Sequence, residues 1–169
     1  PEIVGALAES SLGVAMKVDF YASNEDLITK LEASQGTSGF DIVVPTGPYI
    51  PQMVTKGLLE KLDMSKIPNF SNIDPAYVNR DWDPNNEYSV CKNWGSTGWM
   101  WNKAITGVDS IATWQEFMDV AMNQASGQTS VLDTAPNVAG MYFWANGINW
   151  TTEKAEDLDA YEAFIVDEF

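Results

Sequence analysis

The chain has 169 residues, of which 45% are hydrophobic and 20% charged, a composition typical of a globular protein with one core or two small ones. Its 24 acidic and 9 basic residues give a net charge of −15, which disfavours nucleic acid and anionic membrane surfaces as partners and permits a cationic ligand. Histidine is absent and cysteine occurs once, which excludes the common histidine-dependent catalytic sites, the common zinc sites and an intrachain disulfide.

The first part of the chain alternates between helical and strand patterns. Apolar residues at helical spacing predict a helix over residues 3–12. Residues 14–20 alternate in hydrophobicity and predict a strand, and residues 23–26 form a capping-box pattern that opens a second helix. The β-branched run at residues 40–44 predicts a strand that is buried on both faces. We therefore expect an α/β protein.

The turn after this second strand is the first candidate binding site. It carries Thr46 and leads into a helix that is predicted from near Tyr49 to Gly57. In open α/β sheets, ligands bind at the carboxyl ends of strands, beside helix N-termini. We therefore expect a small ligand to contact the turn at Thr46.

A tryptophan-rich stretch follows an extended connection over residues 63–88, which is rich in turn-forming residues. Residues 94–102 contain three tryptophans and two glycines and predict a strand that another chain segment or a ligand approaches closely. Tryptophan packs in cores and also stacks on alkyl or cationic groups. Both interpretations stay open for this stretch, and Trp94 is its candidate ligand contact.

The last part of the chain again alternates between helices and a strand. A second capping box at Thr113 opens a helix that runs to about Met122, and residues 129–132 predict a short strand. A strand-to-helix turn then leads into a helix over 136–146, and apolar residues in one stripe predict a final helix over about 153–168.

No metal or cofactor site is expected. The segment that begins at Asp81 departs from a calcium-binding loop, because Asn86 replaces the required glycine and Lys92 replaces the final glutamate. No nucleotide-binding glycine motif is present. A carboxylate-dependent hydrolase stays open as another class of function, although the chain has no convergent pair of acids in a turn. We expect a ligand-binding protein and not an enzyme.

Four motifs in order resemble a known family. They match the spermidine/putrescine-binding proteins of bacterial ABC transporters in sequence and spacing, and the resemblance runs along the whole chain. The motifs are Asp41–Thr46, Asn69–Pro75, Asp83–Val90 and Trp94–Gly98.

The resemblance implies a two-lobed periplasmic-binding-protein fold of type II that closes on its ligand by hinge motion. Full members of the family are about twice as long, so the fold is expected to be incomplete here. Residues 1–98 would form most of the first lobe, including a crossover, and residues 99–169 the first part of the second lobe. The implied protein is a monomer, periplasmic or extracellular, that captures a polyamine and delivers it to an ABC permease in the membrane. We expect its signal peptide to lie outside this chain, because the N-terminus lacks the required basic and apolar segments.

The resemblance also assigns ligand contacts in the first lobe. A ligand-contacting hydroxyl falls on Thr46. An aromatic contact two positions later falls on Pro48, a departure from the family pattern, and the adjacent Tyr49 is the candidate substitute.

In the second lobe, two acids that hold amino groups in spermidine-binding members fall on Thr134 and Asn137. Asp133 precedes them and would compensate if the strand ended one residue differently. Asp133 and Thr134 would otherwise only cap the following helix. Because a buried ammonium needs a strong acceptor, the neutral residues leave open a different solute, such as an amino acid or an opine-like compound.

Overall fold

The computed structural model describes residues 2–34, 37, 39–132 and 134–169, which form two compact units. Unit 1 comprises Pro1–Trp94 and unit 2 comprises Gly95–Phe169. The assignment of residues 1–98 and 99–169 to two lobes stays a prediction.

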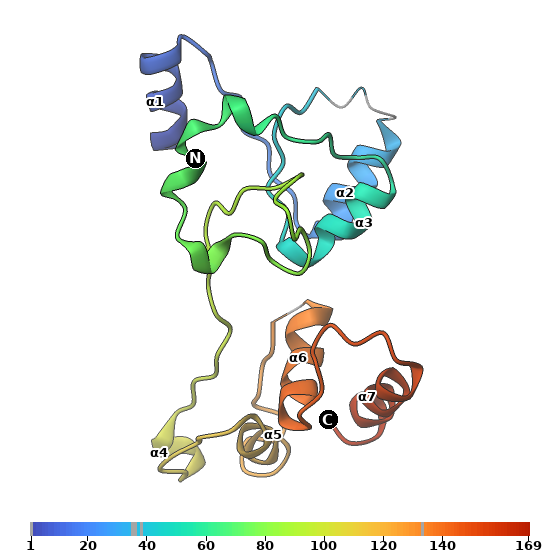
Figure 1. Cartoon of the computed structure of the whole chain (residues 1–169). Coiled ribbons are helices and arrows are strands. Elements are labelled where there is room, and N and C mark those ends of the chain that lie inside the picture. The colour runs from blue at the N-terminus through green and yellow to red at the C-terminus, as the bar shows by residue number, and fades with distance from the viewer. Residues whose placement is uncertain (1, 35–36, 38, 133) are drawn as a thin grey trace. The chain divides into compact units, whose positions relative to one another are not determined.

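Helices are the regular elements of both units (Figure 1). Unit 1 contains α1 (Glu2–Leu12), α2 (Asn24–Ala33) and α3 (Ile50–Thr55), with short 3₁₀ helices at Gly47–Tyr49, Met64–Lys66, Pro68–Asn72 and Pro75–Tyr77. Unit 2 contains α4 (Lys103–Thr106), α5 (Trp114–Met122), α6 (Ala135–Ala145) and α7 (Ala155–Asp167). Every helix that the sequence predicts is confirmed, with its ends shifted by a few residues at most.

The core of unit 1 lies between α2 and α3. Leu27, Ile28 and Leu31 of α2 are buried against Met53 of α3, which is fully buried. The predicted cap is present, because the Ser23 hydroxyl accepts a hydrogen bond from the Asp26 backbone N–H (3.1 Å). Side-chain caps of this kind satisfy one of the free N–H groups of the first turn. The cap fixes the start of α2 next to the Thr46 turn.

The core of unit 2 lies among α5, α6 and α7. Met118, Met141 and Phe164 are buried together, one from each helix. The predicted cap at Thr113 is present, because its hydroxyl accepts from the Glu116 N–H (3.1 Å), and the Glu116 carboxylate accepts from the N–H of Ala112, the residue before the cap (2.6 Å).

The predicted strands are not found, so the α/β class is not confirmed. Over the described ranges no strand is assigned, and the β-type pairing there is an isolated bridge between Arg80 and Asp83. Large apolar side chains in the segments expected as strands are exposed, Phe20 by 74%, Ile42 by 82% and Leu132 by 56%, although Val43 packs against the core of unit 1. A buried sheet is stabilised by layers that cover its apolar faces. A hydrophobic pattern typical of strands is therefore not sufficient for these segments to pair.

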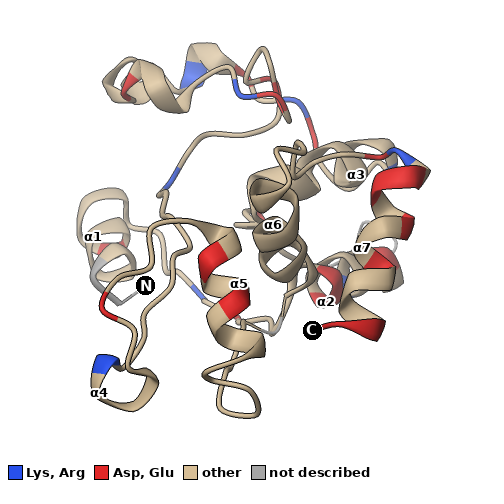
Figure 2. Ribbon diagram, turned by 90° about the horizontal axis from the view of Figure 1, so that it is seen from below, with Lys and Arg blue, Asp and Glu red and all other residues tan. Residues whose placement is uncertain are grey.

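Acidic residues are spread over several helices. Figure 2 shows them along α2, α5 and α7, in agreement with the net charge of −15. Among the described residues, none of the helices combines the length and the apolar character that a membrane crossing requires.

Candidate functional site

The turn at Thr46 is held by the start of α2. The Thr46 backbone N–H donates to the Asn24 side-chain oxygen (2.9 Å), and the Asn24 amide nitrogen donates to the Thr46 hydroxyl oxygen (3.2 Å). The Tyr49 N–H donates to the Thr46 carbonyl (3.0 Å) and closes the turn. Thr46 is exposed, so its hydroxyl proton and second lone pair remain available to a solute. The turn therefore presents a fixed hydroxyl.

Tyr49 joins the core of unit 1 to Glu25, and its contact with a ligand stays a prediction. Its ring packs against the core between α2 and α3, and its hydroxyl donates a hydrogen bond to the Glu25 carboxylate. Burial, followed by the bond to Glu25, raises the pKa of Tyr49 to about 12. The same bond is the largest of the causes that lower the pKa of Glu25, so its carboxylate stays ionised to a lower pH than usual. The group close to the turn is thus the charged Glu25 carboxylate, which the Tyr49 hydroxyl holds by a hydrogen bond.

Trp94 lies at the end of unit 1 and is 67% exposed. Its ring stacks on Tyr77, with 5.3 Å between the ring centroids and 20° between the planes. Stacking orients the indole while much of its surface stays open. Trp94 is thus an accessible aromatic surface, and its contact with a ligand stays a prediction.

Thr134 and Asn137 are brought together at the start of α6. The Asn137 amide nitrogen donates to the Thr134 hydroxyl, and the Thr97 hydroxyl donates to the Asn137 side-chain oxygen (2.8 Å). Thr134 occupies the N-cap position, but its side chain makes no capping hydrogen bond. Asp133, the remaining predicted contact, lies outside the described residues. The polar group here is a neutral chain of two hydroxyls and one amide.

A cavity of about 600 Å³ lies within unit 2 beside this polar group. Its walls include residues 96–102 of the predicted strand over 94–102, and residues 129–132, the other segment predicted as a strand in this unit. Thr97 and Trp101 line it from the first of these segments, and Trp114, Asn137 and Met141 line it from α5 and α6. The volume lies in the range of small-molecule sites, which are apolar with a few placed polar groups.

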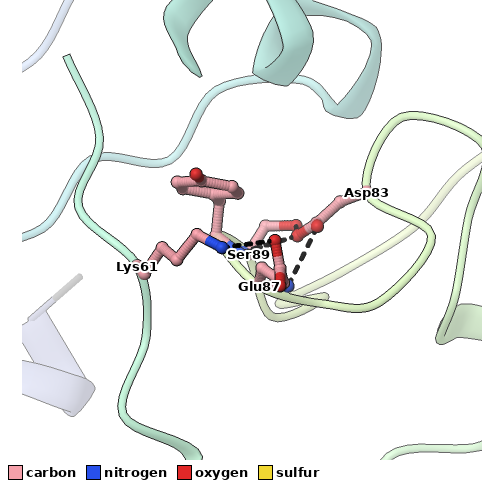
Figure 3. Close-up of polar contacts among 5 residues, drawn as sticks. Lys61, Asp83, Glu87 and Ser89 are labelled. Carbon is pink, nitrogen blue, oxygen red and sulfur yellow. Dashed lines mark hydrogen bonds and ion pairs between the residues drawn. The ribbon is translucent and has the colours of Figure 1, made fainter. Parts of the chain in front are cut away.

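In the described part of the chain, no three histidine, cysteine or acidic side chains cluster in a way that could hold a metal ion. The buried Asp83, in the loop that departs from a calcium site, is used by protein groups instead. Its carboxylate accepts from the backbone N–H groups of Glu87, Tyr88 and Ser89 at 2.8–3.0 Å (Figure 3).

Three residues of these groups were not predicted as site residues: Asn24, Glu25 and Thr97. Asn24 and Thr46 are 22 positions apart, and Thr97 and Asn137 are 40 apart, so no local pattern signals the contacts. The only signal was the presence of Asn24 and Glu25 in the capping-box motif and of Thr97 in the tryptophan-rich stretch.

Comparison with known proteins places these features in a family context. The family model described as bacterial extracellular solute-binding protein matches residues 2–167. Among curated proteins, the spermidine/putrescine-binding periplasmic protein of Escherichia coli is 31% identical over 148 residues, which cover 88% of this chain and 41% of that protein.

Two crystal structures are also similar. The TpPotD lipoprotein of Treponema pallidum has a TM-score of 0.85 and 35% identity, covering 99% of this chain and 51% of that one. The spermidine/putrescine ABC transporter substrate-binding protein PotD of Streptococcus pneumoniae has a TM-score of 0.73 and 27% identity, covering 95% and 48%. The chain thus spans about half the length of the proteins it matches.

Proposed function

Because this chain belongs to the family of bacterial extracellular solute-binding proteins, we propose that it is part of a protein that captures a polyamine, spermidine or putrescine, for an ABC permease in the membrane. The relatives from Escherichia coli and Streptococcus pneumoniae are similar to this chain over most of its length and are named for spermidine and putrescine. We further propose a two-lobed type II fold and a location in the periplasm or outside the cell. The role is binding and delivery, without chemistry on the solute.

The observation that carries this proposal is the exposed Thr46 hydroxyl beside the Glu25–Tyr49 pair. Asn24 holds Thr46 by one hydrogen bond to its hydroxyl and one from its backbone N–H. An ammonium group is a donor only and binds to oxygen acceptors and negative charge. The ionised Glu25 carboxylate supplies that charge in the same turn region. Trp94 supplies the accessible aromatic surface on which the methylene chain of a polyamine packs.

Thr134 and Asn137 of unit 2 are proposed as neutral acceptors for the solute. Both side-chain oxygens already accept one hydrogen bond each within the protein and keep a second lone pair. A neutral acceptor attracts an ammonium less strongly than a carboxylate does. We therefore expect a preference for the shorter putrescine over the more highly charged spermidine.

Isothermal titration calorimetry on the full-length protein tests the proposal with putrescine, spermidine, spermine and, for contrast, lysine. Thr46→Ala is expected to weaken putrescine binding about tenfold or more, because a hydrogen bond to a charged group is lost. Thr55→Ala is the matched control, since its hydroxyl donates to the Pro51 carbonyl inside α3 (2.9 Å) and its loss should change affinity less than about twofold. Absence of heat with all three polyamines would show the proposal to be wrong.

A further inference from the structure

The starting observation is an unusually close packing of Trp82 on Gly47, the residue after Thr46. A methyl group placed on Gly47 would lie 2.4 Å from Cε2 and 2.7 Å from Nε1 of the Trp82 indole. Such distances are far below van der Waals contact, so the ring occupies the space that any other residue at position 47 needs for its side chain. Only glycine fits at position 47, because Trp82 lies against its backbone.

Trp82 is itself held by the loop that follows it. The neighbouring Asp83 is 5% exposed and accepts four hydrogen bonds, from three backbone N–H groups and from the Ser89 hydroxyl (2.8 Å). Figure 3 shows this carboxylate facing Ser89 within the loop, beside the ion pair between Lys61 and Glu87. The Arg80 guanidinium lies 5.3 Å from the centre of the Trp82 ring. The indole therefore projects from a loop that the Asp83 hydrogen bonds hold together.

The Thr46 turn accordingly has two supports from distant parts of the chain. Asn24 of α2 holds it through polar contacts, and Trp82 holds it through apolar contact at Gly47. Asn24 fixes the hydroxyl oxygen of Thr46, whereas the ring limits how far the backbone of the turn can move. Without the ring, the Asn24 contacts could still form, but they alone would not fix the position of the turn.

We propose that Trp82 is a positioning residue that seats the Thr46 turn for solute binding through its contact with Gly47. The inference rests on the proposed function of the turn as a solute contact. Trp82 needs no contact with the solute for this role.

Calorimetry with putrescine on the full-length protein tests the coupling between the two residues. Gly47→Ala is expected to weaken binding about tenfold in the natural background and less than about twofold when Trp82→Leu is already present, because the clash then disappears. Trp82→Phe, which keeps an apolar ring, should bind better than Trp82→Leu. Gly5→Ala in α1 is the matched control, since a methyl group there would meet its nearest neighbour at an ordinary 3.9 Å. Equal losses from Gly47→Ala in both backgrounds would overturn the inference.

A measurement without ligand separates failure of this inference from failure of the proposed function. Protons close to an indole are shifted by its ring current, so the Gly47 α-protons are expected away from their usual NMR region and should return to it in Trp82→Leu, with a displaced Thr46 amide signal. Unchanged Gly47 and Thr46 signals would overturn the inference even if putrescine binds. If no polyamine binds the natural protein, the proposed function is wrong, and these signals alone decide whether Trp82 seats the turn.

Discussion

Asp83 shows how a single buried carboxylate holds a loop that lacks regular secondary structure. Its two oxygens accept hydrogen bonds from three consecutive backbone N–H groups and from a hydroxyl. Buried backbone donors must be paired, and in this loop no neighbouring strand is available to pair them. The carboxylate thus does for residues 87–89 what a ladder of hydrogen bonds does in a sheet.

Asp83→Ala is expected to lower the free energy of unfolding by roughly 3 kcal/mol or more, because it leaves three backbone N–H groups without an acceptor. Urea unfolding of the full-length protein followed by circular dichroism measures the change. Asp81→Ala, two positions earlier and exposed, is the control and should change stability by less than about 0.5 kcal/mol. Similar midpoints for the two variants would contradict the role assigned to Asp83.

The Tyr49–Glu25 pair is expected to make the stability of the fold depend on pH. The pKa of Tyr49 is raised to about 12 by burial and by the bond to Glu25, so the folded state favours neutral Tyr49. This contribution to stability is fully present below the ordinary tyrosine pKa and is lost as the pH rises through about 12. Glu25 has the opposite sign: its pKa is lowered, so its contribution is present above its ordinary pKa and is lost as the pH falls through the lowered value.

Glu25→Gln is expected to lower the pKa of Tyr49, which tyrosinate absorbance during an alkaline titration measures. The shift should be incomplete, since burial is the larger cause and remains in the variant. Tyr49→Phe identifies the Tyr49 signal in the titration. A Tyr49 pKa that is the same in the natural protein and in the Glu25→Gln variant would show that the hydrogen bond does not contribute.

Parts of the candidate site could be predicted from the sequence, because their signals are local. The Thr46 turn was identified from a β-branched run followed by proline and glycine. The contacts of Asn24 and Trp82 with this turn could not be predicted, because each joins positions that are far apart in the chain. The glycine at position 47 is visible in the sequence, but its partner is visible only in the structure.

At the scale of elements, helices were predictable because their caps lie within the same few residues. The Thr113 hydroxyl caps the start of α5 by accepting from the Glu116 N–H, and the motif alone located that helix. Strands need partners and covering layers from elsewhere, so the alternation in residues 14–20 and the apolar run in 40–44 were insufficient. The relatives are about twice as long, and the covering layers expected for these segments need not come from this chain.

Thr113→Ala is expected to cost about 1 kcal/mol, because the N–H of Glu116 loses its acceptor in the first turn of α5. Thr113→Ser keeps a capping hydroxyl and should remain within a few tenths of a kcal/mol of the natural protein. Thermal unfolding of both variants in parallel measures the difference. Equal midpoints would mean that packing of α5 in the core, and not its cap, determines its stability.

At the scale of the whole molecule, the chain exposes much surface for its mass. Its solvent-accessible surface is 12427 Å². A compact protein of 18.7 kDa exposes about 8,300 Å², and two separate proteins of half that mass about 10,000 Å² in total. The excess includes large apolar side chains such as Ile42 and Met100, which are 82% and 91% exposed. In each unit, exposed apolar side chains of this size are typical of surfaces that pack against other protein segments.

Residues 1–169 expressed alone are therefore expected to bind a dye for apolar surfaces several-fold more strongly than a compact protein of the same mass does. Ile42→Thr together with Met100→Gln should reduce the dye signal while circular dichroism shows the same helix content. Weak dye binding by the unmodified chain would contradict the exposed positions of these side chains.

The packing of Trp82 on Gly47 also restricts the order in which this pair can change during evolution. A line of descent that gains any side chain at position 47 while the indole is in place passes through a clashing intermediate, since the methyl group would lie 2.4 Å from the ring. If Trp82 is first replaced by a smaller residue, a side chain at position 47 no longer clashes. A side chain at position 47 therefore becomes possible only after residue 82 has become smaller.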